Sequence, residues 1–150
     1  MNKNIGTYLR LKHGVVLGDL TCEELKIELL RFSGEDNQTT VRGKSLENGL
    51  PKSIRVKSSD VREALLMTLN QIIDGAKELI EISPPEIADT IFSEGITLTG
   101  AMAGVPGFTD FFNKELAIPV HVAERYADAT IYGLIDLDKE PENVYKLVGM

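Results

Sequence analysis

The sequence contains few of the residues that build disulfide frameworks or metal sites. Its 150 residues include one cysteine, two histidines and no tryptophan. The single cysteine, Cys22, cannot form an internal disulfide, which favours a reducing compartment. One cysteine and two separated histidines cannot assemble a metal centre, so we expect no bound metal from these residue types.

Long apolar runs and a strong basic excess are also absent. No run approaches the length of a membrane span, and the first residues lack the apolar core of a signal peptide, so we expect a cytoplasmic protein without a transmembrane segment. The net charge is −7, divided as +3 over residues 1–58 and −10 over residues 59–150. An acidic C-terminal portion argues against a nucleic-acid partner, and the basic residues of the first third look too dilute to form a binding patch.

The remaining composition is that of one soluble domain. The sequence is 43% hydrophobic and 26% charged, and a chain of this length can bury a core without disulfides or metals. Apolar residues at helical spacing predict helices near residues 5–13, 60–82, 86–92, 108–116 and 125–134, and a capping box predicts another helix beginning after Thr21. Ser58 and Ser59 are the expected caps of the longest helix.

Four segments have the composition of strands. Residues 39–43 and 53–57 alternate polar and apolar side chains, with turn residues between them. Residues 96–99 and 118–123 are apolar and alternate with helical segments, which predicts a parallel α/β layer. Because two core strands are too few for a freestanding sheet, we expect another polypeptide segment to pair with them.

A glycine-containing loop follows the strand at residues 96–99. Gly100, Ala101, Met102 and Ala103 lead toward the helix predicted near Phe108. Backbone N–H groups at such a corner can bind anions, and the same corner can simply allow close packing of a strand on a helix.

Other residues of types common in catalytic sites have simpler interpretations. His121 alternates with buried positions on its strand and is expected to face solvent or a partner. Carboxylates near helix starts are explained by the helix dipole, so we assign no catalytic residues.

Taken in order, several segments resemble one family. They are Tyr8-Leu9-Arg10, Leu17-Gly18, residues 21–28, Val41-Arg42-Gly43, residues 49–52, residues 62–65, Pro84-Pro85-Glu86, residues 95–100 and residues 118–124. Together they are similar to the C-terminal half of the MreB family, the bacterial actins, over roughly residues 4–134. The resemblance implies an α/β fold: the second lobe of an actin-like ATPase (ribonuclease H-like), with an incomplete sheet and a small β/α insertion. We expect a core lobe at 1–30 and 83–135, an inserted subdomain at 31–82 and an acidic tail at 136–150.

The resemblance also implies a cytoskeletal protein that binds ATP with magnesium, polymerises and organises cell shape. Its nucleotide-side residues correspond to two short segments of this chain. They are Glu23, Glu24, Leu25 and Lys26 on the capped helix, and Gly100, Ala101, Met102 and Ala103 in the loop. The alternative from the residues alone is that Glu23 and Lys26 pair with each other on an exposed helix face.

Two departures from the family pattern bear on activity. Ala101 and Met102 replace glycines of the family loop, and a Cβ there obstructs approach to the backbone. The family's phosphate loops, metal-positioning carboxylate and catalytic acid have no match in this sequence, so hydrolysis by this chain alone is not expected. Expected partners are a second copy, in a filament or dimer, or the missing N-terminal half; membrane or wall-synthesis partners are implied only by the resemblance. The alternative function is a non-catalytic interaction module that binds a protein through its open sheet edge.

Overall fold

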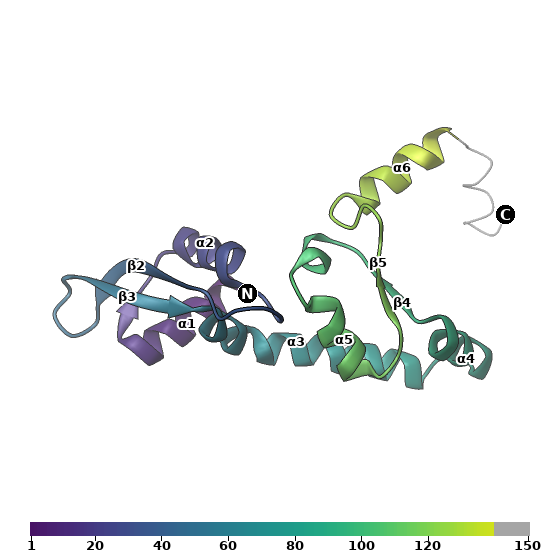
Figure 1. Ribbon diagram of the computed structural model, residues 1–150, viewed down its shortest axis with the longest axis horizontal. Coiled ribbons are helices and arrows are strands. Elements are labelled where there is room, and N and C mark those ends of the chain that lie inside the picture. Colours follow the sequence, from purple (N-terminus) through teal and green to yellow (C-terminus); the bar gives the residue numbers. More distant parts are fainter. Residues whose placement is uncertain (140–150) are drawn as a thin grey trace. The chain divides into compact units, whose positions relative to one another are not determined.

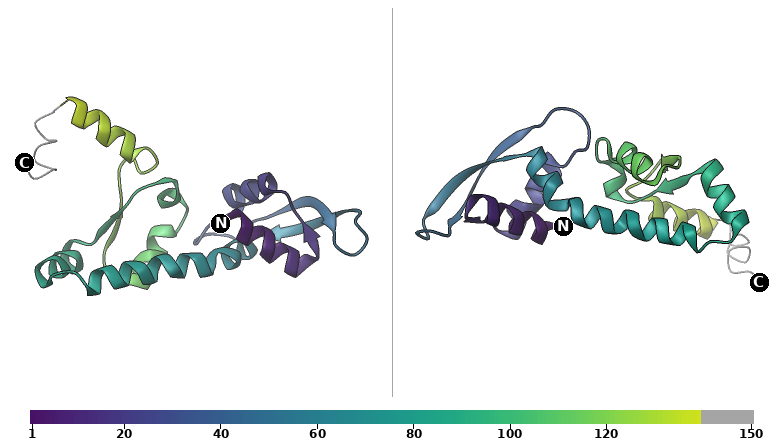
Figure 2. Two further views of the ribbon diagram at one scale, coloured as in Figure 1. Left: turned by 180° about the vertical axis from the view of Figure 1, so that it is seen from behind. Right: turned by 90° about the horizontal axis from the view of Figure 1, so that it is seen from below.

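The computed structural model describes residues 1–139 and divides them into two compact units. Unit 1 covers residues 1–88, and unit 2 begins at Asp89. Figure 1 shows the elements, and Figure 2 shows them from two further directions. Each unit is described by itself. The predicted acidic tail lies outside the described residues from position 140 onward.

Unit 1 combines three helices with a three-stranded antiparallel sheet. Its elements are α1 (Asn2–His13), β1 (Val15–Val16), α2 (Asp19–Leu29), β2 (Gln38–Ser45), β3 (Pro51–Lys57) and α3 (Ser58–Glu81), followed by α4 (Pro85–Glu94) at the unit boundary. The sheet order is β1-β2-β3. The predicted hairpin is confirmed, and the two-residue strand β1 pairs with β2 as a third strand.

The core of unit 1 lies between the three helices and one face of the sheet. Its buried apolar residues are Ile5, Leu9, Val15, Cys22, Leu25, Leu29, Leu30, Ile54, Val56, Val61, Leu65, Leu69 and Ile73. In β3, Ile54 and Val56 are buried while the residues between and beside them are exposed, as strand alternation requires. The hairpin curves over α1, and its other face is turned away from the helices (Figure 2, right).

A polar cluster joins α1 to α3 at the edge of this core. Lys12 Nζ lies 2.6 Å from Asp60 Oδ1, and this pairing raises the pKa of Lys12. Tyr8 donates a hydrogen bond to Glu63 and accepts one from Lys12 (3.1 Å). Asp60 is buried, and a buried charge needs a partner of opposite sign. The Lys12 ammonium is that partner.

Unit 2 is built on a parallel pair of short strands. Its elements are β4 (Ile96–Leu98), a 3₁₀ helix η1 (Ala101–Gly104), α5 (Phe108–Leu116), β5 (Val120–Val122) and α6 (Ala129–Lys139). The predicted parallel pairing is confirmed, with Ile96 opposite Val120 and Leu98 opposite Val122. Phe108, Phe112 and Leu116 form the buried side of α5, as their spacing predicts.

Several predicted helix starts were wrong. Thr21 is not an N-cap, because α2 already begins at Asp19 with Gly18 as its cap. The last helix begins at Ala129 rather than Arg125, because residues 124–128 form turns. The expected serine caps of α3 are absent: Ser58 is its first residue, and Lys57 N–H instead donates to Asp60 Oδ2 (2.9 Å).

Among the described residues, no helix has both the length and the apolar character that crossing a membrane requires.

Candidate functional site

The first predicted segment forms a polar cluster at the N-terminal end of unit 1. Glu23 and Lys26 lie one turn apart on α2, and Lys26 Nζ donates to Glu23 Oε2 at 2.8 Å. Asn2, from the start of α1, donates its amide to the same carboxylate oxygen at 2.5 Å. Lys26 also reaches the carbonyl oxygen of that amide at 3.3 Å. The two helices therefore hold this carboxylate from both sides.

These contacts determine the ionisation of the carboxylate. The Lys26 ammonium first, and the Asn2 amide second, hold the pKa of Glu23 below its ordinary value. An ionised carboxylate accepts hydrogen bonds only, so Glu23 is suited to bind hydroxyl or amine donors. The contact between Glu23 and Lys26 is also the one expected from the alternative in which these two residues pair with each other on an exposed helix face.

A hollow of about 550 Å³ opens beside the cluster. Its lining residues are Met1, Asn2, Lys3, Asn4, Asp19, Glu23 and Lys26. Glu24 is exposed on α2, whereas Leu25 is buried in the core with 1% of its surface exposed. Of the four predicted residues in this segment, Glu23 and Lys26 therefore face a space that a ligand could enter.

The second predicted segment forms the loop between β4 and α5 in unit 2. Gly100 adopts φ +91°, which favours glycine, and the chain then makes the 3₁₀ turn η1 before α5 starts at Phe108. The predicted order of strand, loop and helix is confirmed, including the helix start at Phe108, and the 3₁₀ turn within the loop is the one addition. Ala101 is exposed, Met102 is half-buried and Ala103 is buried.

Tyr126 contacts this loop, and no pattern in the sequence predicted that contact. The Gly100 N–H donates to the carbonyl oxygen of Tyr126 at 2.6 Å, and the Ala103 N–H donates back to Gly100 at 3.0 Å. A Cβ on Gly104 would lie 2.4 Å from the phenol oxygen of Tyr126. Two loop N–H groups are thus used internally, and Gly104 is required by the closeness of the ring.

The two segments belong to different units, and the geometry of each is that of its own unit. Within residues 1–139, no group of three or more His, Cys, Asp or Glu side chains could hold a metal ion. The cluster around Glu23 offers one carboxylate, one amide and one ammonium. This donor set fits the hydroxyl and amine groups of a nucleoside better than it fits a magnesium ion.

Comparison with known proteins gives one consistent answer. The family model "MreB/Mbl protein" matches residues 1–146. The chain is 31% identical over 141 residues to the cell shape-determining protein Mbl of Bacillus subtilis, covering 90% of this chain and 42% of that protein. It is 33% identical over 119 residues to the cell shape-determining protein MreB of Escherichia coli K12, covering 78% of this chain and 34% of that protein.

Solved structures agree with the sequence comparison. MreB5 of Spiroplasma citri bound to AMPPNP matches with a TM-score of 0.89 and 25% identity, covering 99% of this chain and 45% of that chain. Its complex with ADP gives a TM-score of 0.88. A MamK double helical filament, at 14% identity and a TM-score of 0.74, shares the fold.

These matches confirm the predicted actin-like fold and show how much of it the chain contains. The chain spans less than half the length of the curated relatives it matches. On the match over nearly its whole length, the chain belongs to the MreB/Mbl protein family.

Proposed function

We propose that this chain is the second lobe of a bacterial actin and that it binds the nucleoside part of ATP. We further propose that it assembles with other copies and that the assembly determines cell shape. The observation that carries the proposal is the Glu23–Lys26–Asn2 cluster, which lines an open polar hollow in a chain whose relatives include nucleotide-bound MreB5. The curated relatives are cell shape-determining proteins.

The chain's own residues would act on the sugar and base rather than on the phosphates. Glu23, held ionised by its neighbours, would accept hydrogen bonds from sugar hydroxyls, as acidic residues do in other nucleotide sites. Lys26 would donate to an oxygen or ring nitrogen of the nucleoside while its contact with Glu23 keeps it oriented. In unit 2, the loop at Gly100 is the second segment that the family resemblance assigns to nucleotide contact, and the side chains of Ala101 and Met102 limit access to its backbone.

Bound ATP would supply the energy-rich phosphates, with magnesium as their counter-ion. No residue described above is suited to position an attacking water, so we expect no hydrolysis by this chain alone.

The experiment is a thermal-shift titration of the full chain with adenosine, Mg-ADP and Mg-ATP. A ligand that binds only the folded state stabilises it and therefore raises the Tm. At a ligand concentration of a hundred times the Kd, the free energy of unfolding increases by about 2.7 kcal/mol. We expect all three ligands to raise the Tm of the wild type. Glu23→Gln should abolish the shift, whereas Glu28→Gln, an exposed residue of the same helix, should leave it intact.

A second candidate, a non-catalytic interaction module, is favoured by the apolar surface of the smaller helices. Neither α4 nor α6 has a buried residue, and Ile87, Phe92, Ile131 and Leu134 each expose more than half of their surface. Surfaces of this kind mark protein interfaces, here with a second copy or with a complementary lobe. A wild type that sediments as an oligomer yet shows no Tm shift with any of the three ligands would favour this candidate over nucleotide binding.

A further inference from the structure

The strand β3 forms a free edge of the sheet in unit 1. The sheet order is β1-β2-β3, so within residues 1–139 the only strand paired with β3 is β2. Its two buried residues, Ile54 and Val56, belong to the face that covers the core, and its other residues are exposed. A free edge presents unpaired backbone groups to any further strand. This edge is distinct from the short pair β4–β5, for which the sequence predicts an additional segment.

Two hydrogen bonds at the ends of the β2–β3 ladder show which backbone groups point outward. The Ser58 N–H donates to the carbonyl oxygen of Asn37 at 2.8 Å. At the other end, the Ser45 N–H donates to the carbonyl oxygen of Leu50 at 2.9 Å. Hydrogen-bonded and non-hydrogen-bonded pairs alternate along an antiparallel ladder. The even-numbered residues of β3 therefore bond to β2, and the odd-numbered residues direct their N–H and C=O groups to the free edge.

The middle of this edge is where β3 can donate hydrogen bonds outward. Pro51 has no N–H, and the Lys57 N–H is already donated to Asp60 Oδ2 at 2.9 Å. Ser53 and Arg55 lie between these two positions, and each directs one N–H and one C=O group outward. This is the alternation that a short added strand needs in order to continue the ladder.

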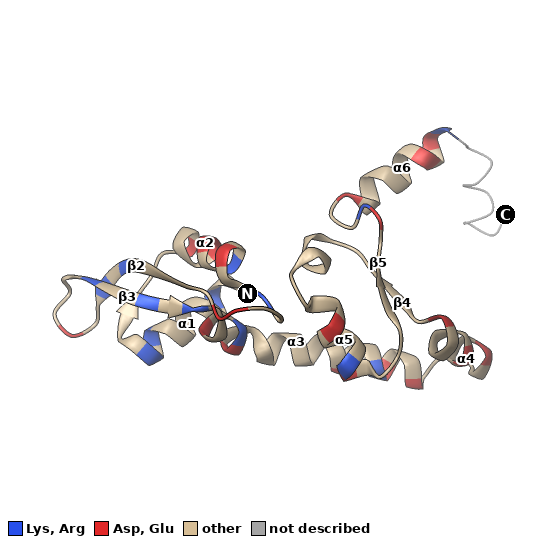
Figure 3. Ribbon diagram, in the orientation of Figure 1, with Lys and Arg blue, Asp and Glu red and all other residues tan. Residues whose placement is uncertain are grey.

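The open face of the same sheet gathers cations that are scattered in the sequence. Even-numbered positions of β2 and odd-numbered positions of β3 share this face, and its cations are Arg42, Lys44, Arg55 and Lys57. Figure 3 shows the blue segments along β2 and β3. None of the salt bridges in residues 1–139 involves one of these four cations. The sequence-based expectation that the basic residues are too dilute to form a patch is therefore wrong for this face.

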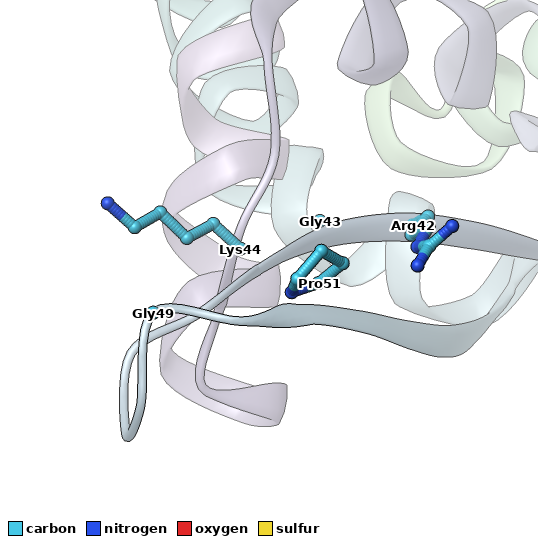
Figure 4. A pocket seen from close by; sticks show the side chains of 5 residues that line it. All are labelled: Arg42, Gly43, Lys44, Gly49 and Pro51. Carbon is cyan, nitrogen blue, oxygen red and sulfur yellow. The ribbon is translucent and has the colours of Figure 1, made fainter.

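Two of the cations are placed to meet side chains of an added strand. Arg55 is itself an edge residue, and Arg42 lies directly opposite Ser53. Neighbouring strands are about 4.8 Å apart, so a long side chain on β2 can extend over a small residue of β3 toward the edge. Figure 4 shows Arg42 and Lys44 on either side of Pro51, around a shallow hollow of about 560 Å³. The hollow leaves room for an anionic side chain beside Arg42.

We infer that the free edge of β3 binds an extended acidic segment of a partner protein as an additional strand. Main-chain hydrogen bonds to Ser53 and Arg55 would supply affinity, and carboxylates at alternate positions of the partner would supply specificity by facing Arg42 and Arg55. The same cations disfavour a second copy at this site, because pairing two identical cationic edges would bring like charges together.

The test is fluorescence anisotropy of the full chain with a short labelled peptide that alternates valine and glutamate. We expect saturable binding, and about tenfold weaker binding of the same peptide with lysine in place of glutamate, because each opposite-charge pair becomes a like-charge pair.

N-methylation of the peptide tests the backbone contact without changing its charge. Alternate N–H groups of an extended strand point to opposite edges. Methylation of the alternate set that faces β3 should abolish binding, whereas methylation of the other set should leave it within about twofold. Equal effects of the two methylated peptides would show attachment by charge alone and would overturn the inference.

Variants of the protein test the same edge from the other side. Ser53→Pro removes an outward N–H, which an edge strand tolerates, and should weaken peptide binding by about tenfold with little change in Tm. Arg55→Gln should weaken it by about fivefold. The matched variant Arg10→Gln removes an exposed cation from α1 and should leave binding within about twofold.

Three further results would each overturn the inference. They are absence of peptide binding by the wild type, equal losses in Arg55→Gln and Arg10→Gln, and a wild type that sediments as a dimer while Ser53→Pro sediments as a monomer. The last result would show that a second copy occupies the edge. Glu23→Gln should lose the ligand-induced Tm shift and keep peptide binding, so this inference and nucleotide binding can fail separately.

Discussion

At the scale of single residues, the N-terminus of α3 shows how distant side chains complete a local structure. Asp36, in the loop before β2, accepts a hydrogen bond from the Ser59 N–H at 2.7 Å and another from the Ser59 hydroxyl at 3.0 Å. Asp60 accepts from the Lys57 N–H on the other side. Two carboxylates at a helix N-terminus accept hydrogen bonds from free N–H groups, and their negative charge interacts favourably with the positive end of the helix dipole. The sequence suggested serine caps because nothing local points to a partner 23 residues earlier.

Asp36 therefore gives the protein a predictable pH dependence. The Ser59 N–H, as the largest cause, lowers the pKa of Asp36 in the folded state. The stabilisation is fully present above the ordinary carboxyl pKa of about 4 and is lost as the pH falls through the lowered value. We expect Asp36→Ala to have a lower Tm than the wild type at pH 7. The two Tm values should become equal at a pH low enough to protonate Asp36 in the folded wild type.

Calorimetric or circular-dichroism melting from pH 7 down to pH 2 measures this difference. Glu35→Ala removes an exposed neighbouring carboxylate and should show little of the effect. A gap in Tm between the wild type and Asp36→Ala that stays constant with pH would contradict the assignment.

At the scale of elements, α3 was the most predictable part of the chain and α6 the least. The stripe of Val61, Leu65 and Leu69 at helical spacing identified α3 because burial of that stripe fixes the helix. The start of α6 was misjudged because the helix has no buried residue, so its pattern carries no record of a packed face. Pairing of β1 with β2 was missed because two residues are too short to show a period.

Gly75 is a weak point in the interior of α3. A Cβ built on it meets no heavy atom within 4 Å, and the residue lies well inside the helix. We expect Gly75→Ala to stabilise the protein by about 1 kcal/mol, because alanine loses less backbone entropy on folding. Urea denaturation measures the change as an increased midpoint with an unchanged slope.

Gly104→Ala is the contrasting variant. Its Cβ would overlap the ring of Tyr126, so the same substitution should destabilise the protein. Two changes of the same sign would show that neither site behaves as its surroundings indicate.

At the scale of the whole molecule, the two units differ in how much apolar surface they bury. Among the described residues, thirteen buried apolar side chains belong to unit 1 and six to unit 2. The parallel pair β4–β5 has three residues in each strand, which is marginal for independent stability. The expectation that an additional polypeptide completes this sheet stays a prediction, and so does the division into a core lobe and an inserted subdomain.

Hydrogen exchange tests the difference between the units. We expect the amides of the β2–β3 ladder, such as that of Val56, to exchange more slowly by at least an order of magnitude than those of β4 and β5, such as that of Val120, because local opening follows local burial. Equal protection in the two units would contradict this prediction and indicate a single cooperative structure.

The order of short motifs along the chain was sufficient by itself to determine the family and the actin-like fold, because relatives keep the same elements in the same sequence. The periodic spacing of apolar residues also determined which residues form the buried stripes of α3 and α5, since burial leaves a periodic pattern. Only the tertiary structure decided that Asn2 joins Glu23 and Lys26, and that Arg42, Lys44, Arg55 and Lys57 share one open face. Both depend on which residues of separate elements lie opposite each other, and strand register and helix packing fix that relation only once the whole unit has folded.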